Sequence, residues 1–262
     1  MIFIGGFMEV LDLKNIDFNK LTLFDSVKST ESSLFYDDDL FYKLYDGFTL
    51  PDTKAKKLSL LNDVKEISNV IIPNILIKNN RMLSGCAMKH IRNSKSVLKY
   101  KDDDCFFELL SNISLTLKNI HSDPRNIVVG DLHFNNILID NNNCHYFIDF
   151  DSCMIGGIPQ DRLSSSLVQY VHNRGDFRFD VSVKTDKLSM FLSVINSLFC
   201  KRIDNVSIME YDEKSDKLYT LKNMRNYFLE IKNNSQYICD VPYMNELVSD
   251  RDVFNIKKIK SR

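Results

Sequence analysis

The chain has 262 residues, of which 44% are hydrophobic, which is enough to bury one large core or two lobes that share a cleft. Its 34 basic and 35 acidic residues give a formal net charge of −1, which argues against a protein that binds nucleic acid through an excess of positive charge. The cysteines are scattered without a Cys-x-x-Cys pair, so we expect reduced thiols and a cytoplasmic protein. The apolar start, MIFIGGFMEVLDL, lacks a basic flank and is too short to span a bilayer, so we expect no signal peptide and no membrane contact.

Strand patterns dominate the first part of the chain. Runs of β-branched and aromatic residues, separated by polar turns, predict strands in three segments: 21–27, 32–38 and 40–46. Residues 51–68 predict a helix, because a proline and an aspartate suit its start and apolar residues then recur at helical spacing. Residues 74–91 predict a hairpin of two strands. We therefore expect a small β-rich lobe with one helix.

Helix patterns dominate the rest of the chain, after a polar connector over 92–104. Apolar stripes at helical spacing lie within three segments: 106–120, 188–199 and 218–231. Between the first two stripes, residues 136–140 and 146–150 predict a pair of short strands joined by a polar turn. A larger helical lobe should therefore follow the β-rich one, and ligands commonly bind at such a junction.

Three polar residues stand at the ends of apolar segments, where burial makes a charge costly. Asp131 and Asn136 lie in IVVGDLHFNNILI, and Asp149 lies in YFIDFDS. Each of them alone is typical of a residue that caps a turn. Together they bring three oxygen donors toward one point, and Mg²⁺ prefers such donors, usually a few carboxylates plus substrate phosphates.

The stretch GDLHFNNILI followed by FIDFD resembles the catalytic loop and metal-binding segment of the protein-kinase-like superfamily, including bacterial Ser/Thr protein-kinase-like proteins. Its Gly-Asp-Leu-His variant is also similar to the aminoglycoside and choline kinases. The resemblance implies an α+β, bilobal fold with a β-rich N-lobe over 1–91 and a mostly helical C-lobe over 92–262. It also implies that Asp131 orients or deprotonates the attacking hydroxyl, and that Asn136 and Asp149 bind Mg²⁺.

The same resemblance implies two further charged residues in the small lobe. Lys43, on a predicted strand, matches the lysine that binds the ATP phosphates, and it would act with Asp131 and Asn136 in catalysis. A carboxylate on the following helix should pair with this lysine. Asp63 is the favoured partner and Glu66 is the alternative, although the family normally has a glutamate at this position.

The remaining ATP contacts are less typical of the family. The segment that matches the glycine-rich phosphate loop, 26–33, contains no glycine, so its backbone can approach phosphate less closely. Hydroxyl groups that could assist belong to Ser29, Thr30, Ser32 and Ser33. The adenine should lie near the backbone of Met88, Lys89 and His90.

Several positions near the motif bear on mechanism and regulation. Asp186 resembles the aspartate that braces the catalytic loop from below, and it also suits a helix N-cap. His133 either contacts the γ-phosphate or, as we favour, braces the metal-binding segment. Asp151 replaces the usual glycine and either binds a second Mg²⁺ or caps a turn. Gly130 stands where regulated kinases have an arginine, so we expect activity without a phosphorylation switch.

The resemblance thus implies an enzyme that moves the γ-phosphate of ATP to a hydroxyl with Mg²⁺ as cofactor. The segment between Asp149 and Asp186 is similar in length to a protein-kinase activation segment, which favours a Ser/Thr protein kinase and a protein substrate. The alternatives are a small-molecule kinase of the aminoglycoside or choline type and a pseudokinase that only binds partners. An enzyme is favoured by the retention of all four family residues together: Lys43, Asp131, Asn136 and Asp149.

Overall fold

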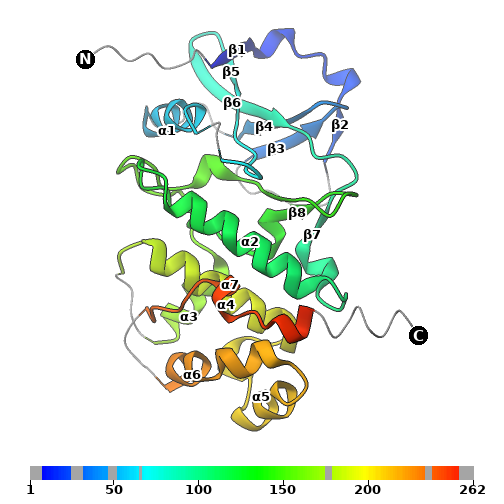
Figure 1. Ribbon diagram of the computed structural model, residues 1–262. Coiled ribbons are helices and arrows are strands. Elements are labelled where there is room, and N and C mark those ends of the chain that lie inside the picture. The colour runs from blue at the N-terminus through cyan, green and yellow to red at the C-terminus, as the bar shows by residue number, and fades with distance from the viewer. Residues whose placement is uncertain are drawn as a thin grey trace.

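The protein is described by a computed structural model that covers residues 8–24, 32–46, 52–64, 67–174, 179–233 and 238–253. It is an α+β structure, with a sheet in the N-terminal region and mostly helices in the C-terminal region (Figure 1). No helix among the described residues is both long and apolar enough to cross a membrane.

Six strands form the N-terminal sheet. In sheet order they are β1 (Glu9–Asp12), β5 (Ile75–Asn79), β6 (Met82–Lys89), β4 (Leu40–Tyr45), β3 (Ser32–Tyr36) and β2 (Thr22–Leu23). β1 runs parallel to β5, and the other pairs are antiparallel. The strands expected over 32–38, 40–46 and 74–91 are confirmed, whereas β1 was not expected because its four residues are too few for a clear pattern.

Helix α1 (Asp52–Asn62) flanks this sheet and is shorter than the predicted 51–68. The chain leaves the helix in a turn in which the backbone N–H of Asp63 donates to the Leu60 carbonyl at 3.2 Å. The Asn-Asp pair at this point explains the early end, because such side chains compete with helical hydrogen bonding. α1 packs against the short helix η5 (Phe150–Ser152) of the C-terminal region.

The C-terminal region combines a small second sheet with a set of helices. The sheet order is β7 (Lys95–Ser96), β8 (Ile137–Ile139) and β9 (His145–Phe147). The helices are α2 (Phe106–His121), α3 (Ser165–His172), α4 (Val183–Phe199), α5 (Ile208–Ser215), α6 (Tyr219–Asn233) and α7 (Met244–Leu247). The three predicted long helices are confirmed as α2, α4 and α6, whereas α3, α5 and α7 are too short for a readable periodicity.

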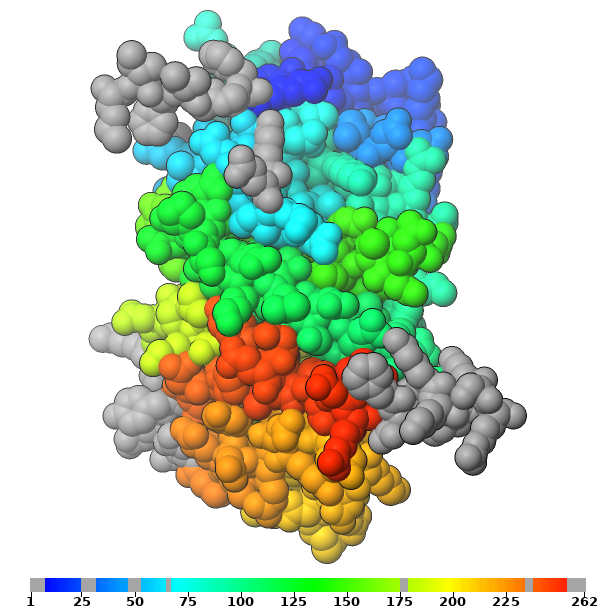
Figure 2. Space-filling model, in the orientation of Figure 1, coloured from blue at the N-terminus to red at the C-terminus, as the bar shows by residue number. Residues whose placement is uncertain are grey.

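Short 3₁₀ helices connect these elements: η1 (Leu13–Asn15), η2 (Phe18–Lys20), η3 (Val97–Tyr100), η4 (Phe134–Asn136) and η6 (Ile203–Asn205), besides η5. One large apolar core runs through the C-terminal region and reaches α1, with Leu58, Phe150 and Phe191 fully buried in it. The sheet region, in blue and cyan, lies at one end of the molecule, and α5 and α6, in gold and orange, lie at the other (Figure 1 and Figure 2). Green α2 lies between them (Figure 1). The loops around β8, β9 and η5 therefore lie where the sheet region meets the helices.

Candidate active site

The β8–β9 hairpin brings the motif residues together. Ile137 pairs with Phe147, so Asn136, which precedes β8, and Asp149, which follows β9, lie at the same end of the hairpin. The Asn136 amide donates to the Asp131 carbonyl at 3.0 Å, which attaches this end to the loop that carries Asp131. The segments that carry the three residues expected to share a site are thus adjacent in the fold.

A buried carboxylate anchors the loop before Asp131. Asp186 is fully buried in α4, and it accepts the backbone N–H of Val129 at 2.6 Å and that of Gly130 at 2.9 Å. His121 Nε2, at the end of α2, lies 2.9 Å from the same carboxylate, and its Nδ1 lies 2.9 Å from the Tyr243 hydroxyl. The predicted bracing role of Asp186 is confirmed, whereas the N-cap of α4 is Ser182.

The glycine before Asp131 has a structural reason. Gly130 has φ +74°, a conformation that side-chain-bearing residues seldom adopt. A Cβ at this position would lie 3.0 Å from the Arg162 carbonyl oxygen, and the Gly130 carbonyl accepts the Ser164 N–H at 3.0 Å. The loop therefore packs directly on the segment that follows η5, and an arginine side chain would not fit in this backbone conformation.

Asp131 itself faces the solvent only partly. Its side chain is 15% exposed, and its Oδ1 lies 3.5 Å from His133 Nε2. The structure thus places His133 beside the expected catalytic carboxylate. Both side chains remain accessible from one side, because that of His133 is 29% exposed.

Lys43 reaches across from β4 to the C-terminal region. Its Nζ lies 2.5 Å from Asp149 Oδ1 and 3.0 Å from Asp151 Oδ1. Burial opposes the ammonium charge, but the two carboxylates outweigh it and raise the pKa of Lys43. Lys43 therefore stays charged and joins the small sheet to the segment after β9, and its position on a strand, β4, is as predicted.

The predicted partner of Lys43 is not where the sequence placed it. Asp63 is exposed in the turn after α1, and the carboxylates that contact Lys43 among the described residues belong to Asp149 and Asp151. The alternative, Glu66, lies outside the described residues. The expectation of a pair between Lys43 and Asp63 is corrected by this geometry, because α1 ends one residue before Asp63.

Helix α1 instead presents two lysines to the C-terminal region. Lys54 Nζ lies 2.9 Å from Asp151 Oδ2 and 2.5 Å from Asp161 Oδ2, and Lys57 Nζ lies 2.5 Å from Asp161 Oδ1. Both lysines are buried. Sequence reasoning missed them, although their spacing to Leu58 and Leu61 places them on the buried side of the helix.

Asp151 is a fully enclosed charge beside Lys43. It is fully buried, and burial alone would disfavour its charge, yet the neighbouring ammonium groups of Lys43 and Lys54 hold the pKa of its carboxyl well below the usual range. The Tyr45 hydroxyl also donates to Asp151 Oδ2 at 3.0 Å. These contacts favour a third reading of Asp151, as the partner of two lysines, over the turn cap or second metal ligand considered from the sequence.

Only some of the residues expected to contact the nucleotide are among those that the structure describes. Ser29 and Thr30 lie outside the described residues, and Ser32 is buried at the start of β3. Met88 is buried in β6. His90 contacts the β3–β4 turn, because its backbone N–H donates to the Asp39 carbonyl at 2.9 Å and its Nδ1 lies 2.7 Å from the Asp37 carbonyl.

The donor set near Asp149 suits Mg²⁺ better than a metal held by protein alone. Within the described ranges, no cluster of three or more His, Cys, Asp and Glu residues could hold a metal ion. Asn136 and Asp149 could supply the smaller oxygen set that Mg²⁺ uses when phosphates and water complete its coordination. Burial, reinforced by the charge of Asp151, raises the pKa of the Asp149 carboxyl, although the Lys43 ammonium opposes this shift.

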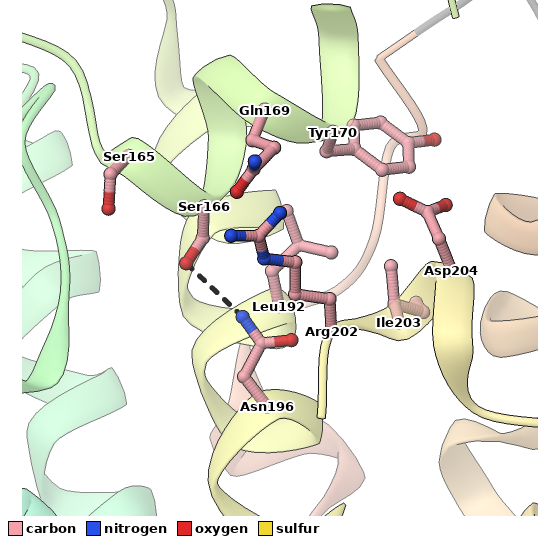
Figure 3. Close-up of a pocket in the computed structure, with 9 residues that line it drawn as sticks. All are labelled: Ser165, Ser166, Gln169, Tyr170, Leu192, Asn196, Arg202, Ile203 and Asp204. Carbon is pink, nitrogen blue, oxygen red and sulfur yellow. Dashed lines mark hydrogen bonds between the residues drawn. The ribbon is translucent and has the colours of Figure 1, made fainter. Parts of the chain in front are cut away.

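A separate pocket lies away from these residues. It has a volume of about 140 Å³ and opens between α3, α4 and η6 (Figure 3). The Asn196 amide donates to the Ser166 hydroxyl at 3.2 Å across it, and Arg202 lies beside them in the close-up. None of the predicted site residues lines this pocket.

Comparison with known proteins supports the architecture. No protein-family model matches the chain, and no curated protein matches its sequence. Among solved structures, the chain is similar to the kinase PK-1 of the Cydia pomonella granulovirus, with a TM-score of 0.56 and 13% sequence identity. The match covers 90% of this chain and 95% of the viral one. A likeness over nearly the whole of both chains, together with the anchored loop and the β8–β9 hairpin, shows that this chain has the protein-kinase-like fold.

Proposed function

We propose that the protein is a phosphotransferase that moves the γ-phosphate of ATP to the hydroxyl group of a Ser or Thr residue in a protein. The observation that carries this proposal is the convergence of Lys43 from β4 with Asp149, next to a loop whose Asp131 is fixed through Asp186. A lysine, two carboxylates and an amide in this arrangement suit positioning and charge stabilisation, which are the main needs of phosphoryl transfer.

Each residue has a distinct role in this proposal. Asp131 accepts a hydrogen bond from the attacking hydroxyl and orients it, because its carboxylate is partly exposed while its backbone is held by Asn136. Lys43 binds phosphate oxygens. Asn136 and Asp149 would hold Mg²⁺, which supplies positive charge to the phosphates when bound.

One observation supports a protein acceptor. The segment from Asp149 to Asp186 contains the accessible residues Ser165 and Ser166 at the start of α3, and it forms one wall of the separate pocket. A long segment of this kind offers more surface to a peptide than to a small alcohol.

The test is incubation of the purified protein with Mg²⁺ and ATP, with ADP release and intact mass as readouts. The Asp131→Asn variant should lose ADP release, whereas Asp216→Asn, which changes an exposed aspartate at the end of α5, should retain it. Added phosphate on the wild type but not on Asp131→Asn would support protein acceptors. ADP release without added mass would mean that the phosphate goes to water, and candidate small-molecule alcohols would then be added to find an acceptor. The absence of both signals would favour a pseudokinase.

A further inference from the structure

Asp151 contacts three side chains of the N-terminal region. Its Oδ1 lies 3.0 Å from Lys43 Nζ, and its Oδ2 accepts from the Tyr45 hydroxyl at 3.0 Å. Lys54 contacts both Oδ2, at 2.9 Å, and the backbone carbonyl of Asp151, at 2.7 Å. A fully buried carboxylate is strongly unfavourable without such partners, so its position depends on them and theirs depends on it.

The contacts of Asp151 continue along α1. Lys54 and Lys57 each lie 2.5 Å from a different oxygen of Asp161. Positive and negative groups therefore alternate in one series, which we name the lysine–aspartate chain: Lys43, Asp151, Lys54, Asp161 and Lys57. The lysines come from β4 and α1, and the aspartates come from the segment that follows β9.

The α1 side chains that face the site carry the opposite charge to the one expected from the sequence. A carboxylate on the helix was expected to position Lys43, but the helix supplies cations and the segment after β9 supplies the carboxylates. Lys54 is the link between the two, because it is the residue of α1 that contacts Asp151. Lys57 contacts Asp161 and serves as a tether of the same helix.

We infer that Asp151 is the positioning residue for Lys43 and that Lys54 attaches Asp151 to α1. Asp151 and Lys54 together thus hold Lys43 in position, the role expected of a carboxylate on the helix. The inference rests on the proposed function, since Lys43 is assigned to phosphate binding there. The acidic group of Asp161 belongs to the unmodified chain, so the lysine–aspartate chain forms without a phosphorylated residue. This agrees with the absence of an arginine before Asp131.

The first readout is catalytic and uses a double-mutant cycle. Asp151→Asn should lower kcat/KM for ATP by about 100-fold, because misplacing a phosphate-binding group by a small distance has effects of this size. Lys54→Met should lower it in the wild type, but by no more than about twofold further when Asp151 is already Asn, because the two residues act through one contact. Lys57→Met is the matched control, a buried lysine of the same helix that has no contact with Asp151, and it should retain kcat/KM for ATP within about twofold.

The second readout does not depend on turnover. Lys43 is treated with an amine-acetylating reagent without ATP or Mg²⁺, and its modification is followed by mass spectrometry. Asp151→Asn and Lys54→Met should each raise the acetylation rate of Lys43 by about tenfold, because the ammonium group is less firmly held and opens to solvent more often. Lys57→Met should leave that rate at the wild-type value.

The outcomes separate this inference from the proposed function. A wild type without ATP turnover would overturn the proposed function, while the acetylation rates would still decide whether Asp151 and Lys54 position Lys43. Unchanged Lys43 acetylation in Asp151→Asn would overturn the inference. So would equal rates in Lys54→Met and Lys57→Met, because the effect would then report only the packing of α1.

Discussion

The two sides of the candidate site hold buried charge in different ways. On the catalytic-loop side, Asp186 accepts two backbone N–H groups, so the backbone itself is the partner. On the α1 side, the lysine–aspartate chain consists mostly of contacts between side chains. Few side chains can replace a carboxylate that accepts backbone N–H groups. An ion pair between two side chains, by contrast, can be kept when the acidic and the basic residue exchange places. The first kind is therefore visible in a sequence motif, and the second is not.

The strongest test of this comparison is on the backbone-anchored side. Asp186→Ala should lower the free energy of unfolding by about 3–5 kcal/mol, because the N–H groups of Val129 and Gly130 and the His121 ring lose their acceptor in a buried place. Urea unfolding measures this loss. Asp186→Asn, which keeps one oxygen, should lose clearly less. A loss below about 1 kcal/mol for the alanine variant would show that the loop is held by other contacts.

A buried neutral group offers a second comparison. His145 is buried in β9 with its Nε2 2.7 Å from the Thr116 hydroxyl, and burial lowers its pKa from 6.5 to about 4. The unfolded chain therefore binds more protons than the folded one between these values. The contribution of this residue to stability is full above pH 6.5 and falls as the pH falls toward 4, by about 2.5 kcal/mol at pH 4.5.

The measurement is urea unfolding of the wild type and of His145→Gln at pH 7.5 and at pH 4.5. Gln keeps a polar group near Thr116 but does not titrate, so the difference between the two proteins should shrink or reverse at the lower pH. Parallel loss of stability in both proteins would mean that carboxylates, and not His145, account for the acid sensitivity.

The side-chain chain on α1 should be less sensitive to the loss of one member. Lys57→Met should lower the free energy of unfolding by about 1–2 kcal/mol, because Asp161 is partly exposed and keeps Lys54 as a partner. Lys56→Met, at the exposed neighbouring position of the same helix, is the control and should change stability little. A loss as large as that of Asp186→Ala would remove the distinction between the two sides.

The sequence was sufficient where local pattern and structure coincide. The long helices, the strands of the hairpins and the bracing by Asp186 follow from periodicity or from one contiguous motif. The sequence was insufficient for Lys54 and Lys57, because their partners lie about a hundred positions away along the chain. The lysine-rich composition of α1 is also typical of a helix exposed to solvent. The sequence was also insufficient for α3 and α5, whose eight residues each are fixed by packing.

The smallest expected effect tests the residue that the sequence had favoured. Asp63→Ala should change the free energy of unfolding by less than about 0.5 kcal/mol, because Asp63 is exposed and its backbone hydrogen bond to Leu60 survives the substitution. ATP turnover should stay at the wild-type rate, in contrast to Asp151→Asn. Steady-state kinetics of the two variants, measured side by side, make the comparison direct. Equal loss of turnover in both variants would mean that Asp63 contacts Lys43 in the working protein. Asp151 and Lys54 would then not be the residues that position Lys43.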